Sequence, residues 1–90
     1  MTDDAEARRR RAVYRACHRG TKEMDIILGR FAQARLGTMP THELTEFEHF
    51  LALPDPDLQE MILHPELRPA GKYAGLIAAL RTFHGLGGGE

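Results

Sequence analysis

The sequence has no tryptophan, a single cysteine and no long apolar run. With only Cys17 present, an internal disulfide and two-cysteine redox chemistry are excluded, which fits a reducing compartment. No apolar stretch approaches the ~20 residues that a membrane span needs, so we expect no membrane contact. The acidic start, with Asp3, Asp4 and Glu6, is unlike a secretory signal or an Arg-rich transit peptide. We therefore expect a bacterial cytoplasmic protein.

Neither sign of charge is in excess. The sequence has 12 lysines and arginines and 13 aspartates and glutamates, which gives a formal net charge of -1. The molecule as a whole is therefore not a binder of polyanions, and any basic surface must be local. A chain of 90 residues forms one domain with a single modest core.

A sustained alternation of apolar and polar residues, which would indicate strands, is also missing. Glycines and prolines instead divide the chain into five segments with apolar residues three or four apart. The expected helices cover about 5–18, 22–36, 41–53, 55–64 and 73–84. This pattern predicts an all-α, compact five-helix bundle, a single domain over 5–84, and a monomer. We expect residues 1–4 to be flexible and the Gly-rich tail 85–90 to be disordered.

Several residues indicate where helices end and which faces are buried. Gly20 is expected to be the C-cap of the first helix. Asp55 is expected to be the N-cap of the fourth, with Pro56 at its first position. Gly29, inside the second helix, costs about 1 kcal/mol relative to alanine, which a close helix crossing would explain. The predicted core of the last three helices is Leu44, Phe47, Phe50, Leu51, Leu58, Met61, Ile62, Tyr73, Leu76, Ile77, Leu80 and Phe83.

No residue pattern points to a catalytic or metal site. Glu46 and His49 form one Glu-x-x-His spacing, whereas a di-iron bundle needs two such motifs and further glutamates, so a solvated helix face is the better interpretation. Cys17 and His18 are adjacent and therefore lie about 100° apart on a helix, which favours a core cysteine over a nucleophile. We expect no metal, no tightly bound cofactor and no enzymatic activity.

Arginines are concentrated in the first helix, at positions 8, 9, 10, 11, 15 and 19. Such a cluster can contact phosphates. Four consecutive residues, however, point around most of a helix, and acidic neighbours offset them, such as Asp4 four positions before Arg8. We favour a solvated helix or a site for an acidic protein surface, and expect no nucleic acid. A small nucleic-acid-binding or regulatory module that uses this helix remains the alternative.

The fragment Arg19-Gly20-Thr21-Lys22-Glu23 forms the corner between the first two helices. Arg19 complements the dipole at the end of one helix, and Glu23 complements the dipole at the start of the next. These features by themselves are typical of an ordinary helix–helix corner.

The same corner carries a family resemblance. Arg-Gly-x-x-Glu at this place resembles the signature of the SdhE-type succinate dehydrogenase assembly factors, also called flavinylation factors. A second match is the run Asp55-Pro56-Asp57-Leu58, while Met61 stands where the family often has tryptophan. The residues that match between Arg11 and Phe31 are Arg11, Tyr14, Arg19, Gly20, Glu23, Asp25, Leu28, Gly29, Arg30 and Phe31.

The resemblance implies binding to the flavoprotein subunit of succinate dehydrogenase, and in some cases fumarate reductase. Such factors assist the covalent linkage of FAD to a histidine of that subunit, while the chemistry belongs to the flavin and its host. The factor would act by favouring a competent conformation. A direct FAD carrier is a second alternative. The partner-binding residues that the resemblance implies are Arg11, Arg15, Arg19, Gly20, Glu23 and Asp25.

Overall fold

The computed structural model describes residues 3–86, which form helices joined by short connections. The all-α, five-helix prediction is confirmed. Residues 1–2 of the predicted flexible start and 87–90 of the predicted tail lie outside the described residues, and Asp3 and Asp4 already belong to the first helix. The elements are α1 Asp3–Cys17, α2 Lys22–Arg35, η1 Leu36–Thr38, α3 Thr41–Leu51, α4 Asp55–Leu63, η2 Gly71–Tyr73 and α5 Ala74–Phe83, where η marks a 3-10 turn.

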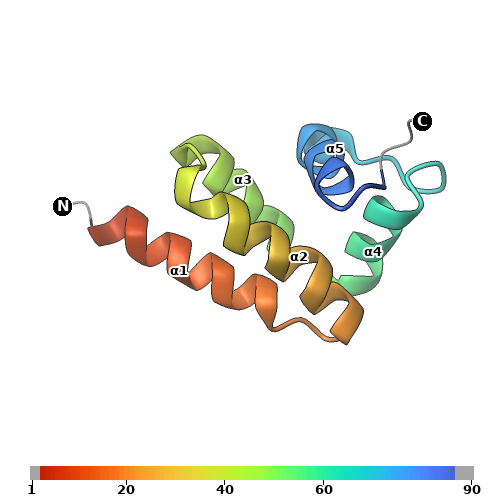
Figure 1. Ribbon diagram of the computed structural model, residues 1–90. Coiled ribbons are helices and arrows are strands. Elements are labelled where there is room, and N and C mark those ends of the chain that lie inside the picture. The colour runs from red at the N-terminus through yellow and green to blue at the C-terminus, as the bar shows by residue number, and fades with distance from the viewer. Residues whose placement is uncertain (1–2, 87–90) are drawn as a thin grey trace.

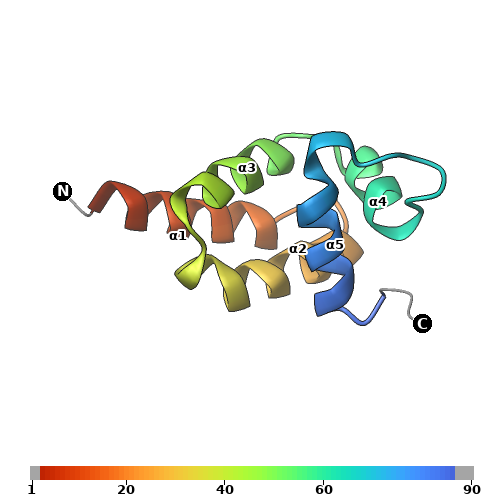
Figure 2. The ribbon, with the colours of Figure 1, turned by 90° about the horizontal axis from the view of Figure 1, so that it is seen from above.

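The helices are arranged along an elongated body of 42 × 24 × 21 Å. α1 and α2 lie side by side and run in opposite directions, and α1 also contacts α3 (Figure 1). α5 packs against both α2 and α4, so α4 and α5 together form the end opposite the start of α1 (Figure 2). None of the helices in residues 3–86 is long and apolar enough to cross a membrane.

Each helix contributes one apolar face to a shared core. The predicted core faces of α3, α4 and α5 are buried, except that Phe83 is half-buried. Aromatic rings link the elements: Phe31 lies 5.9 Å from Phe47 and 5.6 Å from Phe83 between ring centroids, and Phe50 lies 5.2 Å from Tyr73. Within residues 3–86, every buried polar side-chain atom has a hydrogen-bond partner.

α1 approaches α2 closely because its core face consists of small residues. Ala12 and Ala16 are buried, whereas Val13 and Cys17 are only half-buried. A Cβ atom added at Gly29 would lie 3.0 Å from Cys17 Sγ and 3.2 Å from Cys17 Cα. The close helix crossing therefore exists, and it explains why a glycine stands inside α2 despite its conformational cost.

Candidate partner-binding site at the α1–α2 corner

The corner between α1 and α2 is held to the start of α4 by Arg19. Its Nε donates to Asp55 Oδ1 at 2.8 Å, and its Nη2 lies 2.7 Å from the same oxygen. The guanidinium also donates to the backbone oxygens of Leu51 at 2.8 Å and Leu53 at 3.1 Å, where α3 ends and its carbonyls lack helical partners. With 11% of its side chain exposed, Arg19 makes these contacts within the fold, and its expected role in partner binding stays a prediction.

Gly20 and Asp25 complete the same arrangement. The Gly20 N–H donates to Asp55 Oδ2 at 2.6 Å, and the Arg19 N–H donates to the Asp25 carboxylate. We call Arg19, Gly20, Asp25 and Asp55 the corner clasp. Both oxygens of Asp55 are bound in it, so the clasp joins two chain segments more than 30 positions apart.

Two expected helix caps are wrong. Gly20 is not a left-handed C-cap, because the glycines with positive φ among residues 3–86 are Gly71 and Gly85. The N-cap of α4 is Pro54, so Asp55 is the first helical residue and Pro56 the second. The Asp55 carboxylate therefore accepts hydrogen bonds from Arg19 and Gly20 instead of capping its own helix. It remains in the first turn of α4, where a negative charge is favourable.

Replacing Gly20 with alanine is expected to lower the free energy of unfolding by roughly 2 kcal/mol. The added Cβ would lie 2.7 Å from Asp55 Oδ2, so the carboxylate must shift, which weakens its hydrogen bonds with the Gly20 N–H and the Arg19 guanidinium. Urea denaturation measures the loss. In an Asp55→Ala background the same substitution should cost much less, because the obstructing oxygen is gone. An equal cost in both backgrounds would mean that the close approach does not explain this glycine.

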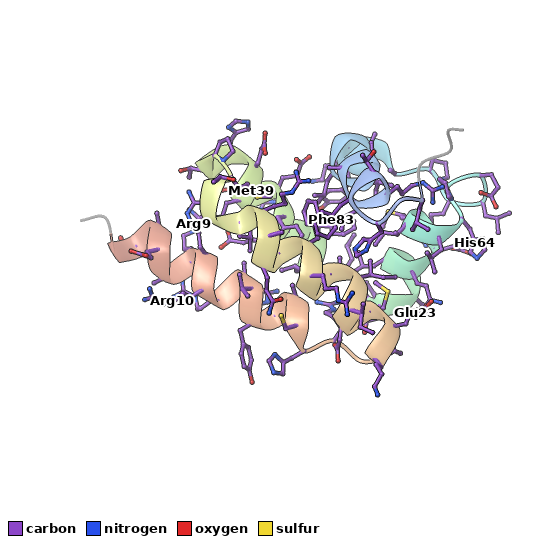
Figure 3. All side chains as sticks on the ribbon, viewed as in Figure 1. Arg9, Arg10, Glu23, Met39, His64 and Phe83 are labelled. Atoms are coloured by element: carbon purple, nitrogen blue, oxygen red, sulfur yellow. The ribbon has the colours of Figure 1, made fainter. Side chains whose placement is uncertain are left out.

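Glu23 is the member of the sequence motif that faces outward. It is exposed in the first turn of α2, at the corner end of the molecule (Figure 3). The one hydrogen bond of its side chain among residues 3–86 is a long one, which Gln59 Nε2 donates at 3.4 Å. Arg11 and Arg15, also implied by the resemblance, are exposed on α1. The structure thus divides the six implied residues into three engaged in the clasp and three that face solvent.

The arginine run of α1 is divided in a similar way. Arg8 donates to both oxygens of Glu48, at 2.6 and 3.2 Å, and to Thr45, so its ion-pair partner is not Asp4. The hydrogen bond from Arg8 is the main reason that the pKa of Glu48 is lowered. Arg9 donates to backbone oxygens of η1 and Met39. Two of the four consecutive arginines therefore hold α1 to its neighbours, which leaves less basic surface for phosphates than the nucleic-acid alternative assumed.

An open groove of about 800 Å³ lies between α1 and α2, and it was not predicted from the sequence. Its conspicuous residue is Tyr14, which is 63% exposed and stacks on His18 with ring centroids 4.0 Å apart. His18 Nδ1 donates to the Tyr14 carbonyl oxygen at 2.7 Å. An exposed tyrosine four positions before a histidine was the available signal, since that spacing places both rings on one side of a helix.

The described residues offer no ready metal site. In residues 3–86, no three His, Cys, Asp or Glu side chains gather where they could hold an ion. Glu46 is half-buried on α3 and His49 is exposed. The side chains of the corner interact through hydrogen bonds and charge.

Residues 10–84 match the family model described as "Flavinator of succinate dehydrogenase". The chain belongs to this family. The match includes the whole corner clasp together with Arg11, Arg15 and Glu23, and it confirms the resemblance found in the sequence.

Curated relatives of this flavinator family member carry consistent names. This chain is 48% identical over 60 residues to the "FAD assembly factor SdhE" of Acetobacter pasteurianus, and the match covers 67% of this chain and 55% of the relative. Two proteins named "Succinate dehydrogenase assembly factor 2, mitochondrial" are also similar. The one from Mycosarcoma maydis is 41% identical over 58 residues, covering 61% of this chain and 24% of the relative. The one from Yarrowia lipolytica is 36% identical over 56 residues, covering 62% and 39%.

The flavinator family member thus matches between a quarter and just over half of the length of these relatives. No solved structure matches the chain significantly.

Proposed function

We propose that this chain binds the flavoprotein subunit of succinate dehydrogenase and promotes covalent attachment of FAD to it. The family match over residues 10–84 carries the proposal. The names of the relatives, which refer to FAD assembly and to succinate dehydrogenase assembly, support it. The flavoprotein subunit of fumarate reductase is a second client to be tested. We propose that the chain acts as a monomer in the bacterial cytoplasm.

In this proposal the factor is not an enzyme and holds no FAD tightly. The flavin and its host protein supply the bond-forming chemistry, and the factor supplies differential binding of one host conformation. A binder shifts a conformational equilibrium only by the ratio of its affinities for the two states. A ratio of about 100 corresponds to roughly 2.7 kcal/mol, which is within reach of a surface carrying a few charged contacts.

The corner clasp gives Glu23 a fixed position for this task. Asp25, two residues further along α2, accepts the Arg19 N–H, and Arg19 in turn is tied to α4 through Asp55. The first turn of α2 is thus held from both sides, so little freedom is lost when Glu23 meets a partner. Arg11 and Arg15, exposed on α1, add attraction to an acidic surface during the encounter.

Replacing Glu23 with alanine should reduce covalent flavinylation of the partner while leaving the factor folded. The carboxylate in the first turn of α2 contributes roughly 0.3–1 kcal/mol to stability through the helix dipole. If it also contacts the flavoprotein, the covalent flavin fluorescence of the dehydrogenase subunit in a gel should fall by more than this small stability change explains. Cells carrying each variant at equal abundance provide the comparison.

Glu43 supplies the matched control for that experiment. It is also an exposed glutamate in the first turn of a helix, α3, so Glu43→Ala removes a similar dipole contribution at a different place. We expect normal flavinylation with Glu43→Ala. Equal fluorescence with both variants and wild type would remove Glu23 from the interface and leave the Arg11 side of the corner as the next candidate.

Titration with free FAD distinguishes this proposal from a flavin carrier. We expect no saturable quenching of flavin fluorescence at micromolar concentrations of the factor. Saturable binding would favour the carrier.

A further inference from the structure

The groove between α1 and α2 has the shape of a docking site for an extended segment. Its volume of about 800 Å³ lies within the ~300–1,000 Å³ typical of ligand sites, and it is open to solvent along the helices. Apolar atoms dominate its lining. The residues that form it include Val13, Cys17, Ala32 and Leu36, with Arg10, Tyr14, His18 and Gln33 around them.

Tyr14 is prepared for contact with a partner. The residue is 63% exposed, yet its ring is stacked on His18 with an angle of 22° between the rings, and the His18 ring is held by its hydrogen bond to the Tyr14 carbonyl. A large side chain that is already ordered loses little freedom on binding. Tyrosine and arginine are also the residues most often found at the energetic centres of interfaces.

The charge around the groove selects the kind of partner. Arg9 and Arg10 line the groove, and Glu6 is the single acidic residue of the lining. Within residues 3–86 these two arginines form no ion pair, and Arg9 donates to the backbone oxygens of Leu36 and Met39. The face is therefore locally positive in a chain whose net charge is -1. It attracts an acidic segment and repels the same face of a second copy.

The groove is also continuous with the corner. Cys17 and His18 belong to its lining and directly precede Arg19 of the clasp. Figure 3 shows Arg10 on α1 and Glu23 at the corner end of the α1–α2 pair. A partner that contacts both Glu23 and His18 therefore reaches the corner end of the groove.

We infer that this groove docks an extended acidic segment of the flavoprotein, with an apolar side chain against Tyr14 and a carboxylate beside Arg10. The inference rests on the proposed function and adds a second contact area to the contact at Glu23. It predicts that affinity for the flavoprotein depends on Tyr14 and on the local positive charge.

The affinity of the purified chain for the purified flavoprotein subunit tests this inference. Tyr14→Ala should bind about 30-fold more weakly, as expected when a hot-spot residue of an interface is truncated. Leu67→Ala is the matched control, because Leu67 is 66% exposed in the loop between α4 and η2, and it should bind within about twofold of wild type. Thermal unfolding of both variants should match that of wild type, since both side chains are mostly exposed.

A pair of charge reversals tests the acidic nature of the segment. Arg10→Glu and Lys72→Glu change the net charge equally, but only Arg10 lines the groove. Arg10→Glu should weaken binding and reduce its dependence on salt, and Lys72→Glu should do neither. Equal effects would show that only the net charge of the chain matters, and they would overturn the inference that the docked segment is acidic.

A photo-reactive phenylalanine analogue at position 14 identifies the occupant. Crosslinks mapped by mass spectrometry should fall in a flavoprotein peptide that contains Asp or Glu, and the same analogue at position 67 should give none. Crosslinks to a second copy of this chain, or to no flavoprotein peptide, overturn the inference. If wild type binds no flavoprotein, the proposed function fails as well. If wild type and Tyr14→Ala bind equally well, docking of the flavoprotein in the groove is excluded, while the proposed function stands.

Discussion

Replacing Arg19 with alanine is expected to lower the free energy of unfolding by about 3 kcal/mol. The loss arises because Asp55, whose side chain is 18% exposed, keeps a negative charge without its partner. The backbone oxygens of Leu51 and Leu53 also lose their donors at the end of α3. Urea denaturation followed by circular dichroism measures the change.

Two companion variants make this result specific. Arg19→Lys keeps the charge but cannot present three donors in one plane, so we expect it to recover only part of the lost stability. Arg30→Ala removes an exposed arginine of α2 and should change stability by less than about 0.5 kcal/mol. A loss below about 1 kcal/mol for Arg19→Ala would show that water replaces the guanidinium and that the clasp does not stabilise the fold.

Replacing Phe47 with alanine should cost roughly 3–5 kcal/mol, much of the stability of a domain this small. Phe47 is fully buried on the core face of α3, and its ring lies 5.9 Å from that of Phe31. Removing the ring leaves a cavity that the surrounding helices can fill only in part. Chemical denaturation with matched slopes for wild type and variant gives the value.

Phe83→Ala provides a comparison for the same chemical change at a less buried position. Phe83 also contacts Phe31 but is half-buried at the end of α5, so its truncation should cost less than that of Phe47. If Phe47→Ala costs less than about 1 kcal/mol, the core repacks around the missing ring and is less rigid than its burial indicates.

The structure separates two roles within the family motif. Arg19 and Gly20 have hydrogen-bond partners within the chain, whereas Glu23 is exposed, so we expect the first two to act mainly through stability and Glu23 to affect stability only weakly. Substitutions at the first two positions should therefore lower flavinylation in proportion to the loss of folded factor. Substitution of Glu23 should lower it at constant abundance. Measuring abundance and flavinylation together distinguishes the two roles.

The sequence was sufficient to predict the helices and most of the core. These features depend on local periodicity: a buried helix face requires apolar residues three or four apart, as at Leu44, Phe47 and Leu51. Gly29 could be noticed as an unfavourable residue inside a helix. The physical reason for it, a close crossing with Cys17, needed both helices in place.

The partners of the charged residues were decided by tertiary structure alone. Arg19 binds Asp55 36 positions away, and Arg8 binds Glu48 40 positions away, although Asp4 stands at the helical spacing from Arg8. The groove beside Tyr14 likewise depends on how α1 docks against α2. Local spacing fixes which face of a helix is apolar, but the long, flexible arginine side chain takes the acceptor that helix packing brings near. That packing depends on the whole core, so it cannot be predicted from any short stretch of the sequence.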